Sequence, residues 1–150
     1  MSDFIAVNLE DTLSKLNVTK QEVAGAVRHG VSDSANMIKE QAKTALVNTG
    51  LNVTFSRHYS SPLIEGVKAY MWRSMPVGVV HIMGDNRNND GTWRLRFFEN
   101  GTKERFTRKG FSRGKITGTK FFEQVIQGKQ AVVESIIDNA IKNNIDNINI

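Results

Sequence analysis

A run of basic and aromatic side chains between positions 103 and 115 offers the clearest chemistry in this 150-residue sequence. Cations attract phosphates and carboxylates, and exposed aromatic rings stack on nucleobases. The run therefore predicts an exposed segment that meets an acidic partner, either nucleic acid or an acidic protein surface. A solvated loop without a partner, whose phenylalanines pack against the body of the protein, is the alternative. The residues are Lys103, Arg105, Phe106, Arg108, Lys109, Phe111, Arg113 and Lys115.

The net positive charge of the chain is concentrated around this run. Positions 91–120 hold nine of the 20 lysines and arginines but only two of the 15 acids, a local balance of +7 in a chain of net charge +5. The rest of the chain is slightly acidic. A basic excess confined to one segment favours a local interaction surface over a uniformly basic protein.

Catalytic residues and metal ligands are not predicted. The absence of cysteine excludes disulfides, thiolate catalysis and cysteine-based zinc sites. His29, His58 and His81 lie too far apart for the short spacings of histidine metal motifs. His81 lies in an apolar run, which favours a hydrogen-bonded core histidine. The turn between Asp85 and Asp90 lacks the ligand ladder of a calcium loop. We therefore expect no enzyme activity, no metal and no cofactor.

Two long helices are predicted to support the basic segment. Thr19 and Glu22 fit a capping box, and apolar residues then recur every three or four positions to about Val47. Gly25 and Gly30 weaken this helix unless another backbone approaches it closely. A second helix is predicted from residue 121 to about 141, followed by a tail at 143–150 that either frays or docks on a neighbouring subunit.

An antiparallel meander of three strands is predicted between the helices. The strands are expected at 67–73, 77–83 and 92–98, the last from alternating apolar and basic side chains. A short strand at 4–9, a helix at 11–16 and a loop at 51–62 complete the prediction. The fold class is thus α+β, with a small antiparallel meander packed against two long helices. We expect a single domain over 1–150 that carries a long, mobile, basic loop at 103–118.

The turn at 99–102 is predicted to be the root of this loop. Asn100 and Gly101 suit a backbone with positive φ, which ends the preceding element. The root residues are Glu99, Asn100, Gly101 and Thr102.

The order of these elements resembles the neck, or tail-component, proteins of long-tailed bacteriophages. It comprises a helix through Ala42-Lys43, Thr49-Gly50-Leu51, a meander, Glu99-Asn100-Gly101-Thr102, a variable loop, and Phe121-Phe122 before a last helix. The resemblance covers roughly residues 4–142. One departure is that the chain lacks the Arg-Pro-Phe run that the family often has before the last helix.

The resemblance implies a structural virion protein that is made in the host cytoplasm and completes the tail or joins head to tail. Identical copies, six or twelve, would form a ring around the DNA passage. The ring would meet the head-closure or connector protein on one face and the tail terminator or tail tube protein on the other, without a membrane. Its basic loop would either face the passing DNA or dock on an acidic neighbour, and the glycine content favours docking. Residues 99–102 would form the fixed root of the loop and a subunit contact, and Glu99 would pair with an arginine of the same or the next subunit.

A second functional hypothesis remains open at this point. Residues 103–115 could serve a non-catalytic nucleic-acid-binding module, in which Phe106 and Phe111 stack on the bases of a single strand.

Overall fold

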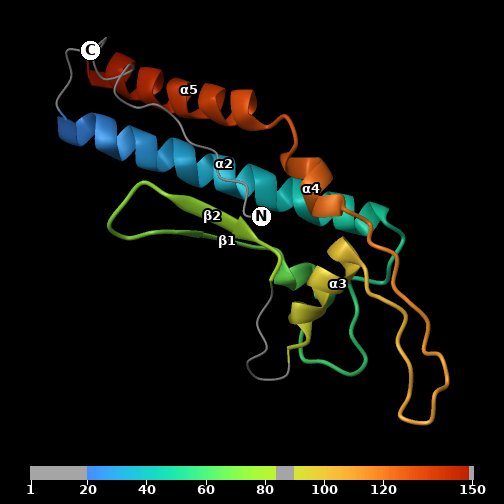
Figure 1. Ribbon diagram of the computed structural model, residues 1–150. Helices are drawn as coiled ribbons and strands as arrows, with labels where there is room; N and C mark the ends of the chain where they lie inside the picture. The colour runs from blue at the N-terminus through green and yellow to red at the C-terminus, as the bar shows by residue number, and fades with distance from the viewer. Residues whose placement is uncertain (1–19, 84–89, 149–150) are drawn as a thin grey trace. The chain divides into compact units, whose positions relative to one another are not determined.

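The computed structural model describes residues 20–83 and 90–148 (Figure 1). These residues form helices and one two-stranded hairpin, which confirms the α+β class. None of the helices within the described ranges is both long and apolar enough to cross a membrane. The elements are α2 (Lys20–Asn48), η1 (Leu63–Gly66), β1 (Lys68–Met71), β2 (Gly78–His81), η3 (Thr92–Arg94), α3 (Leu95–Asn100), α4 (Phe121–Ile126) and α5 (Gln130–Ile148).

The chain divides into two compact units, and α2 and the β1–β2 hairpin each contribute to both. The described part of the helical unit comprises residues 20–37, 69–79 and 126–148. The described part of the arm unit comprises residues 38–68, 80–83 and 90–125. Whether the chain behaves as a single domain stays a prediction.

Helix α2 confirms the first predicted helix, and Gly25 and Gly30 do not interrupt it. In the helical unit, α5 runs antiparallel to α2 (Figure 1). Asn144 Nδ2 donates a hydrogen bond to the Glu22 carbonyl at 3.3 Å, and Ile137 lies against Gly30. The buried side chains of the two helices include Val23, Val27, Val133, Ile137 and Ile141.

Gly30 is needed where α2 and α5 approach each other. A Cβ atom added at this position would lie 2.8 Å from the Ile137 Cα atom and 3.2 Å from the Ala140 Cβ atom. A backbone atom cannot rotate away, so α5 would have to move. Around Gly25, by contrast, no heavy atom of the described residues outside its own stretch of helix lies within 4 Å of such a Cβ.

These two glycines give a matched pair of predictions with opposite signs. We expect Gly25→Ala to raise the free energy of unfolding by about 0.5–1 kcal/mol, because alanine is the better helix former. We expect Gly30→Ala to lower it by up to about 2 kcal/mol, because overpacking outweighs the same gain. Urea unfolding followed by circular dichroism measures both. Equal shifts in one direction would show that the helices do not pack this closely.

The first two predicted strands are confirmed with shorter bounds as β1 and β2. At the end of the hairpin, the Trp72 N–H donates to the Val77 carbonyl at 2.9 Å. The Arg28 guanidinium of α2 donates to the carbonyls of Trp72 and Arg73 at 2.8 and 3.0 Å. This end of the hairpin is therefore held on α2 while several of its apolar side chains are exposed. These are Tyr70, Trp72, Met75 and Val77.

The predicted third strand, 92–98, is wrong, because this segment forms η3 and α3. Asp90 Oδ1 accepts hydrogen bonds from the Thr92 N–H and hydroxyl at 2.8 and 2.9 Å, which favours a helical start. Thr92, Leu95 and Glu99 are the buried residues, at the spacing of one helical face. The predicted meander is thus reduced to a two-stranded hairpin within the described residues.

The predicted second long helix is interrupted. Helix α4 ends at Ile126 and α5 begins at Gln130, with Gly128 at φ 70° between them. A φ in this range ends an α-helix and favours glycine. After the break, α5 continues to Ile148, so the predicted tail is helical as far as it is described.

The remaining predictions have mixed outcomes. The predicted loop at 51–62 is confirmed, because this segment has no helix or strand, and the helical turn η1 begins after Pro62. The predicted strand at 4–9, the predicted helix at 11–16 and Asp85 lie outside the described residues. His81 lies in β2, half-buried, and its burial, with a smaller contribution from the charge of Lys68, lowers its pKa.

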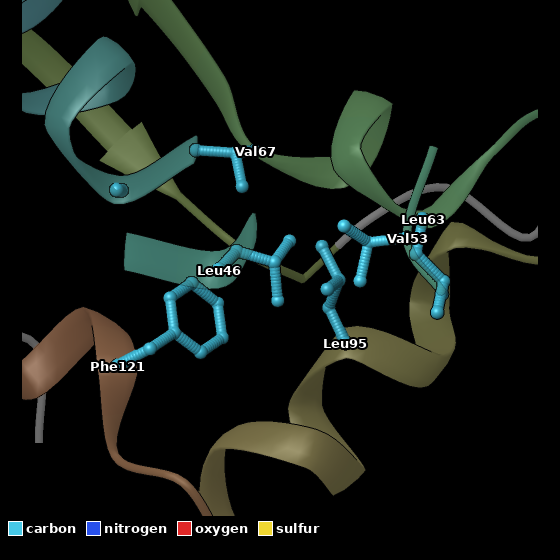
Figure 2. Packing of buried hydrophobic residues seen from close by; sticks show 7 residues of the cluster. Leu46, Val53, Leu63, Val67, Leu95 and Phe121 are labelled. Carbon is cyan, nitrogen blue, oxygen red and sulfur yellow. The ribbon is translucent and has the colours of Figure 1, made fainter. Parts of the chain in front are cut away.

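The arm unit has its own apolar core (Figure 2). Figure 2 shows the side chains of Leu46, Val53 and Leu95 directed toward one another, with the Phe121 ring beside Leu46. Helices α2, α3 and α4 therefore meet in one cluster. The buried members are Ala42, Leu46, Val53, Leu63, Val67, Leu95 and Phe121.

Candidate partner-binding arm

Residues 101–118, within the segment between α3 and α4, are called the arm here. A long, mobile, basic loop was predicted, and the two halves of the arm run antiparallel as a ribbon, with one isolated β-bridge between Phe106 and Ser112 (Figure 1, yellow to orange). The N–H groups of Thr102, Arg105 and Thr107 donate to the carbonyls of residues 116, 114 and 111 at 2.9, 3.1 and 2.8 Å. Cross-strand hydrogen bonds thus extend from the root of the arm to its tip.

The tip is a tight turn. The Gly110 N–H donates to the Thr107 carbonyl at 2.9 Å, and Gly110 has φ 83°. The Thr107 hydroxyl accepts a further hydrogen bond from the Phe111 N–H at 3.1 Å. A glycine with positive φ at this position is typical of short hairpin loops. The turn presents Arg108 and Lys109 at the end of the arm.

The register of the ribbon assigns its side chains to two faces. Phe106 lies directly opposite Ser112, so both side chains are on one face. Glu104 shares that face, because its Oε1 atom accepts a 2.7 Å hydrogen bond from the Ser112 hydroxyl. Side chains alternate between the two faces along each strand, so the residues next in sequence to Phe106 and Ser112 lie on the opposite face. That cationic face carries Arg105, Thr107, Phe111 and Arg113.

The root of the arm is fixed by Glu99 of α3. Its side chain is buried, with 6% relative exposure, and it accepts hydrogen bonds from the N–H groups of Phe122 and Glu123, both at 3.0 Å. These are free donors in the first turn of α4, so Glu99 caps that helix from 23 residues away in sequence. Within the chain, its two oxygens bind backbone N–H groups, and the pairing of Glu99 with an arginine of the same or the next subunit stays a prediction.

The residues that flank the arm, Phe98 and Thr119, are also in contact. The N–H and hydroxyl of Thr119 both donate to the Phe98 carbonyl, at 2.8 and 3.0 Å. Gly101 has the predicted positive φ, 78°, and a Cβ atom at Gly118 would lie 2.7 Å from the Glu99 carbonyl oxygen. Only glycine fits this close approach. Sequence reasoning identified Gly101 but missed Gly118, because nothing local indicates which backbone lies against it.

An open hollow of about 420 Å³ lies where the two strands of the arm leave the root. Lys103 and Lys115 line it from opposite strands, together with Thr102 and Thr117. The Thr102 hydroxyl also accepts a hydrogen bond from the Ile116 N–H at 3.0 Å. Ile116 also lines the hollow, which is therefore of mixed polarity and flanked by two cations.

The side chains of the arm are directed to solvent. Phe106 and Phe111 have relative exposures of 60% and 70%, so they do not pack against the body of the protein as the alternative supposed. Across the described residues, no ion pair joins a cation of the arm to an acid. The predicted site residues thus fall on the root (Glu99, Asn100, Gly101, Thr102), the first strand (Lys103, Arg105, Phe106), the tip (Arg108, Lys109) and the second strand (Phe111, Arg113, Lys115).

Other chemistry finds little support. The described residues contain no group of three or more histidines, cysteines or acids that could hold a metal ion. His29 and His58 are exposed, and the three histidines are not brought together. The arm can therefore present charge and aromatic surface to a partner.

Compared with known protein families, curated proteins and solved structures, the chain shows no match.

Proposed function

We propose that this protein is a structural component of the neck of a long-tailed bacteriophage. Identical copies form a ring that joins the DNA-filled head, through the connector or head-closure protein, to the tail terminator or tail tube. The protein has no catalytic turnover, is made in the host cytoplasm and remains in the virion. The arm is its contact with another molecule.

The observation that carries this proposal is an exposed, ordered arm on a fixed root. Six cations and two aromatic rings project from a ribbon whose base is held by Glu99, Gly101 and Gly118. A preorganised arm loses little conformational entropy on binding, as suits a protein that must dock during assembly. The exposed apolar side chains at the hairpin end of the helical unit, such as Trp72, fit contacts between copies.

Deleting the gene from its phage or prophage tests the neck assignment. Negative-stain electron microscopy of the induced lysate should show filled heads beside separate, finished tails. Normal infectious particles would reject the proposal. Complementation with the wild-type gene should restore joined particles.

A quadruple variant then tests the arm. Complementation with R105Q/R108Q/K109Q/R113Q should leave heads and tails unjoined, while circular dichroism of the purified protein remains that of the wild type. The matched control, K39Q/K43Q/R57Q/K142Q, removes four positive charges outside the arm and should restore joining. Normal particles with the arm variant would show that the arm is not the contact.

A further inference from the structure

The cationic face of the arm indicates which kind of partner it meets. We propose that the arm binds double-stranded DNA without sequence specificity, through the phosphate backbone. This inference rests on the proposed function, in which the ring surrounds the DNA passage, but it can be tested on the purified protein alone.

A cross-strand pair of arginines is the first argument. Arg105 and Arg113 lie opposite each other, with the Arg113 N–H donating to the Arg105 carbonyl at 2.6 Å. Like charges in such a pair destabilise an exposed ribbon. An anion bound between the two guanidinium groups removes the repulsion, and guanidinium geometry matches phosphate oxygens in bidentate pairs.

The spacing of the cations along the arm is the second argument. Lys103 and Lys115 flank the hollow at the root, and Arg105 and Arg113 form a pair in the middle of the arm. Arg108 and Lys109 lie at the tip. At roughly 3.3 Å per residue, the positions from 103 to 108 span about 17 Å. This length corresponds to about five phosphates of one DNA strand along the helix axis. A line of cations therefore faces a polymer with a regular line of charges.

The shape of the arm favours a duplex over a single strand. The major groove of B-DNA, about 12 Å wide, admits a two-stranded ribbon. Binding a single strand instead would need a common stacking surface. Phe106 and Phe111 are both exposed but lie on opposite faces, so they do not provide one. An acidic protein surface would need carboxylates spaced to match the cations of the arm. Any DNA duplex already carries phosphates in a regular line.

Fluorescence anisotropy of the full-length protein with a labelled 30-base-pair duplex, from 50 to 300 mM NaCl, tests the inference. With six phosphate contacts, log Kd should rise with log[salt] with a slope of about 5 per bound chain. In R105Q/R113Q the slope should fall by about 2, and affinity at 50 mM NaCl should fall at least tenfold. This variant should fold normally, because it removes a repulsive pair.

One control isolates the cationic face. K39Q/K43Q removes the same charge from the surface of α2 and should leave the slope unchanged. An unchanged slope in R105Q/R113Q would overturn the inference. So would tighter binding to a single strand of the same sequence that depends on Phe111, as a stacking module requires. If the wild-type protein binds no duplex at 50 mM NaCl but the arm variant still fails to join heads to tails, the partner is an acidic protein. The inference then fails, while the proposed function stands.

Discussion

Replacing Glu99 with alanine should lower the free energy of unfolding by about 2–4 kcal/mol. The carboxylate is buried and accepts two backbone N–H groups at the start of α4, both at 3.0 Å. Hydrogen bonds to a charged group are stronger than neutral ones, and removal of the acceptor leaves two donors without it. Urea unfolding measured by circular dichroism gives the difference.

Glu104→Ala is the matched control for this prediction. Glu104 is an exposed carboxylate on the arm, so its loss should change the free energy of unfolding by no more than about 0.5 kcal/mol. Glu99→Gln should lie between wild type and Glu99→Ala, because an amide keeps one acceptor oxygen but turns a donor toward the second N–H. If Glu99→Ala unfolds at the wild-type urea midpoint, this carboxylate does not hold the root of the arm.

Phe121→Ala should lower the free energy of unfolding by more, about 3–5 kcal/mol. The Phe121 ring has 2% relative exposure and lies in the core of the arm unit beside Leu46 (Figure 2). Truncation to alanine loses the burial of the ring and leaves a cavity that the surrounding helices fill only in part. Because Phe121 is the first residue of α4, the substitution also loosens the point at which the arm returns to the protein.

The same substitution at Phe111 provides the control. Phe111 is 70% exposed on the arm, so Phe111→Ala should shift the free energy of unfolding by no more than about 0.5 kcal/mol. Equal losses at the two positions would mean that Phe111 is packed in solution. A near-neutral Phe121→Ala would contradict the core shown for the arm unit.

The two large predictions address one physical question, namely how the arm is held. A charged ribbon has few apolar contacts of its own, so its direction depends on the residues that anchor its ends. Glu99 links α3 to α4, and Phe121 anchors α4 in the core. Variants of these residues should therefore weaken binding by the arm without removing any of its cations.

Local patterns in the sequence were sufficient for several elements. The capping residues and apolar spacing predicted α2 almost to its bounds, and apolar runs around a Pro-containing turn predicted the β1–β2 hairpin. The composition of residues 103–115 predicted an exposed segment, and all six of its cations are exposed. In each case the decisive interactions are made between residues close in sequence, or with water.

The secondary structure of short segments was ambiguous, because their local pattern fits both a strand and a helix. Seven residues at 92–98 alternate as a strand does, yet Thr92, Leu95 and Glu99 also match one face of a helix. The tertiary structure decides which pattern is buried. Gly128, at φ 70°, likewise divides the predicted last helix, although the apolar spacing continues across it.

The sequence by itself therefore determined the α+β class, the long helix α2, the hairpin, and the position and charge of the arm. Only the tertiary structure decided that the arm is a ribbon, that Phe106 and Phe111 lie on opposite faces, and that Glu99 caps α4. The physical reason is that these features depend on strand register and on a hydrogen bond between residues 23 positions apart. Residue type and spacing do not specify such pairings until the chain has folded.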